Sequence, residues 1–375
     1  MVTNHGWGYA LGNALLIAAI AALLVGGPSI WIVAVIILAV GAPVDESVGD
    51  TDNHISESHV LFFQANVYAT LPLLALATLA LWRIVALTFH TGIIAVIPQV
   101  FPAMGSGGYA DVGVAVFLVG YCYAVFGATV GHELTHRTGV LAAYVSARGL
   151  FALTFNTGFT IFHVHGHHRQ VATFADPATA RRGEYILAFV ARTIAAQFLS
   201  ALKFEAARER QRGHMPFGLS NRAVSGQLYS LGILIIAAVI AGVPGVIASV
   251  IAGLVGRFFH ELVNYVQHFG LVRVEGSPVG PRHTWDCHRL LSNLLHYNLP
   301  MHADHHMFAG KPFWKLDRVA NAPVLPHGYQ TMVVVAFVPS LWQRTMGPLL
   351  AAWDSQAAND EERALIRQRG WEGRC

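Results

Sequence analysis

Long apolar runs separated by short polar segments dominate the chain and predict its main elements. A helix that crosses a bilayer needs about 20 mostly apolar residues. On this criterion the sequence predicts six spanning helices: Tyr9–Val25, Ser29–Ala42, Val60–Trp82, Asp111–Val130, Tyr229–Ala252 and Leu254–Val272. The first two are short, and the glycines and proline at 26–28 between them predict a helical hairpin.

Two further apolar stretches differ from these six. Ile84–Val100 precedes a loop rich in proline and glycine, which favours a re-entrant or outer-face segment. Val140–Ile161 carries Arg148 near its middle, where a charge is costly inside a bilayer. Leu11–Val25 follows no basic segment and lacks a convincing cleavage site, so we interpret it as a retained helix rather than a signal peptide.

The composition agrees with a membrane protein. Hydrophobic residues make up 54% of the chain and charged residues 12%, whereas soluble domains carry roughly a quarter charged residues. The net charge is only +3 and no basic patch alternates with aromatic residues, so we expect no nucleic-acid partner. The three cysteines, at 122, 287 and 375, form no CxxC pair, which argues against a built-in rubredoxin or iron–sulfur module.

The charges predict which parts face which side of the membrane. Eleven lysines and arginines lie between Arg137 and Arg222, and loops rich in these residues usually face the cytoplasm. We therefore predict an all-α integral membrane protein with about six transmembrane helices and a cytoplasmic histidine-rich helical cap. Its expected parts are helices 1–4 in residues 1–131, a cytoplasmic histidine region at 132–228, helices 5 and 6 at 229–272, a second cytoplasmic region at 273–353, and a charged, solvated tail at 354–375.

Histidine is unusually frequent, with 20 residues against 21 acids, and fourteen histidines fall in His132–His168 and His260–His306. His132 and His136 end an apolar helix and are four residues apart, so both imidazoles lie on one helix face and can reach one ion. The pattern His-Glu-x-x-His is also the motif of zinc proteases. By itself it therefore leaves the metal and the reaction open.

Two more histidine patterns repeat this spacing. His163 and His167 lie one turn apart, and His168 turns toward a neighbouring site, while His165 fits neither position. The segment His302–His306 has the spacing His-x-x-His-His, and His268 ends an apolar helix upstream. The candidate ligands are therefore nine: His132, His136, His163, His167, His168, His268, His302, His305 and His306.

The number of ligands indicates two metal ions. A zinc site takes about four ligands, so nine are too many for one ion and suffice for two ions with open positions. Imidazole suits zinc, copper, iron or nickel, and it does not identify the metal. Because the ligands must converge, His136 and His163 lie on the same side of the membrane, and Val140–Ile161 cannot be a simple span.

The histidine motifs resemble those of the membrane-bound alkane 1-monooxygenase family and the related hydroxylase component of xylene monooxygenase, within the wider class of fatty-acid desaturases and hydroxylases. The resemblance covers most of the chain from about residue 40 and is most specific from 131 to 306. It rests on these segments: Gly131–Arg137, His163–Arg169, Val171–Thr173, Asp176–Arg181, Asn264–Leu271, His283–Asp286, Ser292–Leu294 and His302–His306.

The resemblance implies a six-helix enzyme of the bacterial inner membrane with a diiron centre facing the cytoplasm. It would use O2 to hydroxylate a terminal C–H bond of an apolar hydrocarbon, with an n-alkane as the favoured substrate. Electrons would come from a separate rubredoxin- or ferredoxin-type protein and its NAD(P)H-dependent reductase. All nine histidines match the family's positions, and the residues expected to support them or the reaction are Glu133, Asp176, Asn264, Gln267 and Asp304.

The motif details divide between two substrates. Alkane enzymes commonly have a glutamate where this chain has Gln267, a position at which it is more similar to the xylene enzyme. The segments around His302 and Asp176 are more similar to the alkane enzymes. Hydroxylation of an aromatic methyl group is therefore the alternative, and a lipid desaturase, a zinc protease and a binding protein with vestigial histidines are weaker ones.

Overall fold

The computed structural model describes residues 6–51, 59–96 and 108–375, and all regular structure in these ranges is helical apart from two isolated β-bridges. Six described helical segments are long and apolar enough to cross a membrane: Trp7–Val25, Pro28–Val48, Val60–Phe89, Tyr109–Thr135, Ile186–Gln211 and Arg222–His268. The first four correspond to the first four predicted spans. The chain is an all-α integral membrane protein, as predicted.

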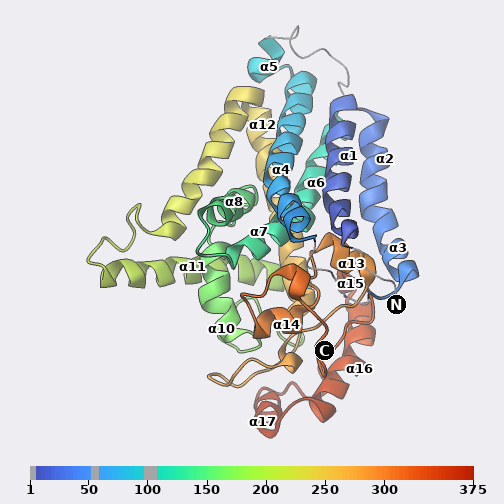
Figure 1. Ribbon diagram of the computed structural model, residues 1–375, viewed down its shortest axis with the longest axis vertical. Coiled ribbons are helices and arrows are strands. Elements are labelled where there is room, and N and C mark those ends of the chain that lie inside the picture. Colours follow the sequence, from blue (N-terminus) through green and yellow to red (C-terminus); the bar gives the residue numbers. More distant parts are fainter. Residues whose placement is uncertain (1–5, 52–58, 97–107) are drawn as a thin grey trace.

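The first four segments form the bundle of Figure 1 and include short π-helical interruptions. Their parts are η1 (Trp7–Ala10) with α1 (Leu11–Val25); α2 (Pro28–Val35), η2 (Ile36–Val40) and α3 (Gly41–Val48); α4 (Val60–Phe89); and α6 (Tyr109–Cys122), η4 (Tyr123–Ala128) and α7 (Thr129–Thr135). Such π-helical turns often occur at functional sites. Here η4 leads directly into the helix that carries His132.

The segment α12 (Arg222–His268) consists of two arms rather than one straight helix. A continuous helix of 47 residues would be about 70 Å long, more than twice the roughly 30 Å hydrocarbon core. Gly242 has φ 64° and ψ −161°, and Pro244 follows it. Figure 1 shows the two arms meeting near α5 (Gly92–Val96). The predicted break after Ala252 is therefore wrong, although two spans remain.

The remaining apolar candidate, α11 (Ile186–Gln211), falls inside the predicted histidine region. Figure 1 shows it running across the foot of the bundle instead of along it. The other doubtful stretch, Val140–Ile161, is not a span, because α8 (Leu141–Ala152) has only 12 residues. Arg148 on α8 is buried and donates a hydrogen bond from Nη2 to the carbonyl of Arg222 at 2.7 Å.

The predicted separate segment Ile84–Val100 is also corrected in part. Residues up to Phe89 belong to α4, because the apolar run continues past Trp82 without a helix-breaking residue, and α5 follows after a short turn. Residues 97–100 of this prediction lie outside the described residues. Of the predicted re-entrant or outer-face segment, only α5 is therefore separate from α4 among the described residues.

Short helices at the lower end of the bundle in Figure 1 carry six of the nine candidate histidines. They are α9 (Phe159–Phe162), η5 (His163–His167), α10 (His168–Gln170), η6 (Pro281–His283), α13 (Leu290–Leu295), α14 (His302–Met307) and η7 (Phe313–Lys315). The chain ends in α15 (Tyr329–Ala336), α16 (Pro339–Gln356) and α17 (Asp360–Gln368). The tail from 354 is not fully solvated as expected, because Glu362 and Ile366 on α17 are buried.

Candidate metal centre

Four parts of the chain bring the nine predicted histidines together. The HExxH pair comes from α7 and the residue after it, three histidines come from η5 and α10, one ends α12, and three lie on α14. The histidines form two groups in which one ring nitrogen of each residue lies within 4.8 Å of the others. The first group is His132, His136, His163, His168 and His305; the second is His167, His268, His302 and His306.

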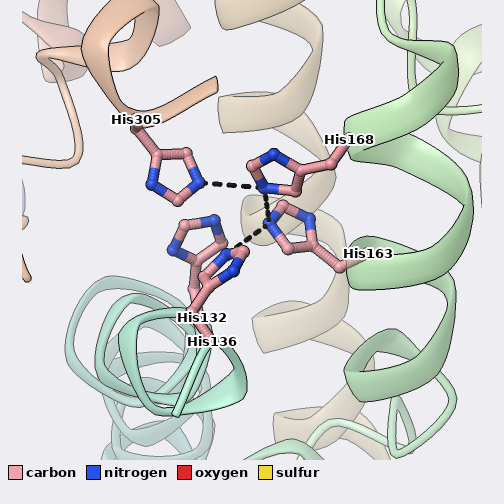
Figure 2. A group of neighbouring side chains, drawn as sticks. All are labelled: His132, His136, His163, His168 and His305. Carbon is pink, nitrogen blue, oxygen red and sulfur yellow. Dashed lines mark hydrogen bonds between the residues drawn. The ribbon is translucent and has the colours of Figure 1, made fainter. Parts of the chain in front are cut away.

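The first group converges on one point, as Figure 2 shows. Nε2 of His163 lies 3.1 Å from Nε2 of His136 and 2.9 Å from Nε2 of His168. Nε2 of His168 lies 3.1 Å from Nε2 of His305. Two nitrogens bound at about 2.1 Å to one ion at right angles are about 3 Å apart, so these separations fit ligands of a shared ion.

The second group has the same form. Nε2 of His302 lies 3.1 Å from the Nε2 atoms of both His268 and His306. The two groups are neighbours, because the rings of His168 and His306 stack with centroids 4.4 Å apart. Consecutive residues divide between them: His167 and His306 belong to the second group, while His168 and His305 belong to the first.

The protonation of these rings fits a metal better than hydrogen bonding among themselves. Burial and neighbouring imidazoles hold the pKa of His163, His168, His305 and His306 well below the usual value of 6.5, so the rings are neutral at pH 7. A neutral imidazole has one N–H and one lone pair, and the converging nitrogens cannot all pair off as donors and acceptors. The buried Nε2 of His167 has no hydrogen-bond partner in the described structure.

Asp176 is the predicted supporting residue with direct contact to the histidines. Its Oδ2 lies 2.8 Å from Nδ1 of His167, and both side chains are fully buried. The carboxylate also accepts hydrogen bonds from the Thr179 hydroxyl and the Ala178 amide, which fix its orientation. By accepting the Nδ1 proton, Asp176 leaves the Nε2 lone pair of His167 free for a metal.

The other predicted supporting residues have partners elsewhere. Asp304 accepts hydrogen bonds from the Lys311 ammonium and the Asp317 amide instead of from an imidazole. Glu133 accepts from Arg137, four residues on, at 2.6 Å. The side-chain amide of Asn264 donates a hydrogen bond to Glu261 at 3.0 Å, and the side-chain amide of Gln267 donates one to the Tyr329 hydroxyl at 2.9 Å.

Two features of the site were not predicted. Asp286 accepts a hydrogen bond from the Ala303 amide at 2.7 Å and so holds the first turn of α14; the segment His283–Asp286 belongs to the resemblance, but no role was predicted for this carboxylate. His296 is buried beside the first group without belonging to it. His165, which fitted neither predicted position, stacks on Phe204 away from both groups.

An apolar cavity of about 350 Å³ reaches both histidine groups. This volume lies within the roughly 300–1,000 Å³ range of small-molecule sites. Histidines 132 and 163 of the first group and 167 and 302 of the second line it. Its other walls are mainly apolar, with Phe117, Val125, Phe259, Val263 and Phe337 among them.

Comparisons with known proteins point to one family. The model of the fatty acid desaturase family matches residues 108–336, more than half of the chain. Alkane 1-monooxygenase 1 of Pseudomonas aeruginosa is 32% identical over 243 residues, 64% of this chain and 63% of that protein. Alkane 1-monooxygenase 1 of Alcanivorax borkumensis is 33% identical over 231 residues, 60% of this chain and 56% of that protein.

A further relative carries a different substrate in its name. The xylene/toluene monooxygenase hydroxylase component of Pseudomonas putida is 27% identical over 248 residues, 64% of this chain and 66% of that protein. The chain thus spans less than two thirds of the length of each of these three relatives.

Proposed function

Because the chain belongs to the fatty acid desaturase family, we propose that it is a membrane monooxygenase that hydroxylates a terminal C–H bond of an apolar substrate. The favoured substrate is an n-alkane, which becomes a primary alcohol with O2 as co-substrate. The nine histidines would hold two iron ions. The relatives named alkane 1-monooxygenase support this reaction.

The observation that carries the proposal is the cavity that connects apolar walls with both histidine groups. A hydrocarbon can fill such a space with one end against the histidines, and the two groups offer enough ligands for two ions. Acid–base and nucleophilic side chains cannot cleave an unactivated C–H bond. Bound irons would supply the redox chemistry that activates O2.

The protein's own residues then position the reactants and exclude water. Phe259 and Val263 hold the hydrocarbon chain against the histidine end of the cavity, which aligns the reacting methyl group. Asp176 keeps the proton of His167 on Nδ1, and Asp286 holds the first turn of α14. An adjoining apolar groove between α2–η2 and α6 shares Leu38 and Phe117 with the cavity, which supports entry of the substrate from the bilayer.

The proposal takes the electrons from a separate protein, which is consistent with the three separate cysteines of this sequence. The proposal includes a rubredoxin- or ferredoxin-type donor with an NAD(P)H-dependent reductase. It also places residues 132–228 and 273–353 on the cytoplasmic side of a bacterial inner membrane, with the arginine-rich 137–222 region facing the cytoplasm.

Metal analysis combined with product analysis tests the proposal. We expect purified protein to contain about two irons per chain, and reconstituted protein with a donor system to convert octane into 1-octanol. One zinc without iron would contradict the diiron centre. An alkene instead of an alcohol would replace the hydroxylase by a desaturase.

A specific feature favours the aromatic alternative. Gln267, the position at which the chain is more similar to the xylene enzyme, donates a hydrogen bond to Tyr329 in the cavity wall, and a relative named as a xylene/toluene monooxygenase component is 27% identical to this chain. Parallel turnover of octane and m-xylene under identical donor conditions separates the two. A clear preference for m-xylene would change the substrate and leave the proposed chemistry in place.

A further inference from the structure

A second, much smaller cavity lies beside the hydrocarbon cavity and shares part of its wall. Its volume is about 10 Å³, measured as the space open to the centre of a water molecule. Four residues line both cavities: Thr129, His132, His296 and Leu299. These residues therefore form a wall shared by the two cavities at the edge of the first histidine group.

The small cavity suits a single water molecule. Its volume is at the lower limit for one water, which needs roughly 10–15 Å³ and several polar partners. Glu133 and His296 provide polar groups in its lining. Glu133 also pairs with Arg137, and both side chains are partly exposed, at 12% and 18%, so a partly exposed ion pair begins at the lining of the small cavity.

A hydrogen bond joins two of the residues that line both cavities. Oγ1 of Thr129 lies 3.1 Å from Nδ1 of His296, and both residues are buried. Thr129 precedes His132 by three residues on α7, so its hydroxyl lies on the same helix face as this histidine. Burial lowers the pKa of His296 to about 4, which keeps the ring neutral at pH 7 with one nitrogen free to accept a proton.

We propose that Thr129 and His296 relay protons from the small cavity to the histidine end of the hydrocarbon cavity, an inference that rests on the proposed function. Hydroxylation of RH by O2 consumes two protons and two electrons from the donor protein, and it yields ROH and water. In each relay step Nε2 of His296 accepts one proton delivered through the water. Nδ1 passes its proton to Thr129 Oγ1, whose own proton leaves into the hydrocarbon cavity. The ring, now protonated on Nε2, turns so that this nitrogen faces Thr129 before it carries the second proton.

The pair Thr129→Val and Thr129→Ser tests the relay. Valine keeps the shape of threonine without the hydroxyl, whereas serine keeps the hydroxyl. We expect T129V to lower the rate of product formation by about 100-fold, the lower end for a lost proton-transfer group. T129V should also release more hydrogen peroxide per electron pair and change the solvent deuterium isotope effect, and T129S should restore all three readouts toward wild type.

Iron content and melting temperature are measured on the same preparations, so a folding or metal defect is recognised independently of activity. His296→Leu serves as a second variant and should give the same uncoupling, while His165→Gln, outside both cavities, serves as the matched histidine control. Product formation and peroxide release at wild-type levels in T129V and H296L would overturn the relay. Lack of hydroxylation by wild type would instead overturn the proposed function.

Discussion

At the scale of single residues, the two neighbouring histidine pairs determine how one cap could hold two ions. Successive residues of a helix point about 100° apart, so His167 and His168 face different groups, as do His305 and His306. Each of these two short segments therefore contributes to both sites. Because adjacent residues bind in different groups, the two groups must lie close together. The stacking of the His168 ring on the His306 ring reflects this closeness.

The unequal sizes of the two groups predict unequal effects of losing one ligand. His268→Ala leaves three histidines in the second group, whereas His305→Ala leaves four in the first. Since zinc and similar imidazole-bound ions take about four ligands, we expect H268A to lose about one metal per chain and H305A to retain both more weakly. Elemental analysis after dialysis measures this, with H165A as the control. Equal loss in both variants would contradict the division into two groups.

Asp176 offers a second prediction at this scale. Replacing it by asparagine removes the charge that holds the Nδ1 proton of His167, and such changes lower metal affinity by roughly 10- to 100-fold. Competition with a chelator measures the affinity of D176N. The matched variant is Asp304→Asn, whose carboxylate binds Lys311 instead of an imidazole, and its affinity should stay closer to wild type. An equal loss in D304N would show that charge near the cap, and not orientation of His167, matters.

The histidine site could be predicted better than its surroundings. Helical spacing identifies residues on one face, and all nine predicted histidines lie in the two groups. Spacing does not identify contacts outside a single helix, so Asp304 was expected to support the histidines or the reaction but accepts hydrogen bonds from Lys311 and the Asp317 amide. The role of Asp286 depends on an amide 17 residues further on, which no local pattern indicates.

At the scale of elements, α12 shows why a hydrophobic pattern predicts spans better than their ends. Its apolar run continues through both arms, so length alone indicated two helices and periodicity could not locate the turn. The local signal was Gly242 followed by Pro244, where the backbone takes φ 64°. This conformation is essentially restricted to glycine. The turn also packs on Thr91, whose hydroxyl donates a hydrogen bond to the Ala241 carbonyl.

Gly242→Ala is therefore expected to destabilise the protein by about 1–3 kcal/mol through backbone strain. A methyl group at this position would also lie 3.1 Å from Cβ of Thr91. Gly232→Ala is the control, because Gly232 lies within the first arm with open space beside it and alanine favours a helix. Thermal unfolding in detergent should give a lower melting temperature for G242A only. A normal melting temperature for G242A would mean that the two arms do not turn at this residue.

At the scale of the whole molecule, the C-terminal helices connect the loops that support the histidines. Arg182 lies in the loop that also carries Asp176. It donates two hydrogen bonds, of 2.6 and 2.8 Å, to Asp354 of α16. Arg369 lies over the ring of Phe174 at 4.0 Å in the same loop. The charged composition of the tail suggested a solvated segment. Its contacts could not be predicted, because its partners are far away in the sequence.

Glu362 forms the other connection, to the segment that leads into Asp286. Its buried carboxylate accepts hydrogen bonds from Arg282 Nε at 3.0 Å and from Arg282 Nη2 at 2.9 Å, and it lies 2.9 Å from Nε2 of His283. Burial alone would raise the pKa of Glu362, but the hydrogen bonds with His283 and Arg282 outweigh it and lower the pKa to about 2. The folded state therefore favours the ionised carboxylate.

Glu362→Gln should lower stability at pH 7 by about 2 kcal/mol, the usual contribution of a hydrogen bond to a charged group. Because the folded pKa is below the unfolded value near 4.5, this contribution is complete above pH 4.5 and is lost as the pH falls toward 2. The melting temperatures of metal-free wild type and E362Q should hence differ most at pH 7 and converge on acidification. The exposed neighbour Glu361→Gln should match wild type at every pH. A difference between wild type and E362Q that stayed constant from pH 7 to pH 3 would show that Glu362 stabilises the cap by packing and not by charge.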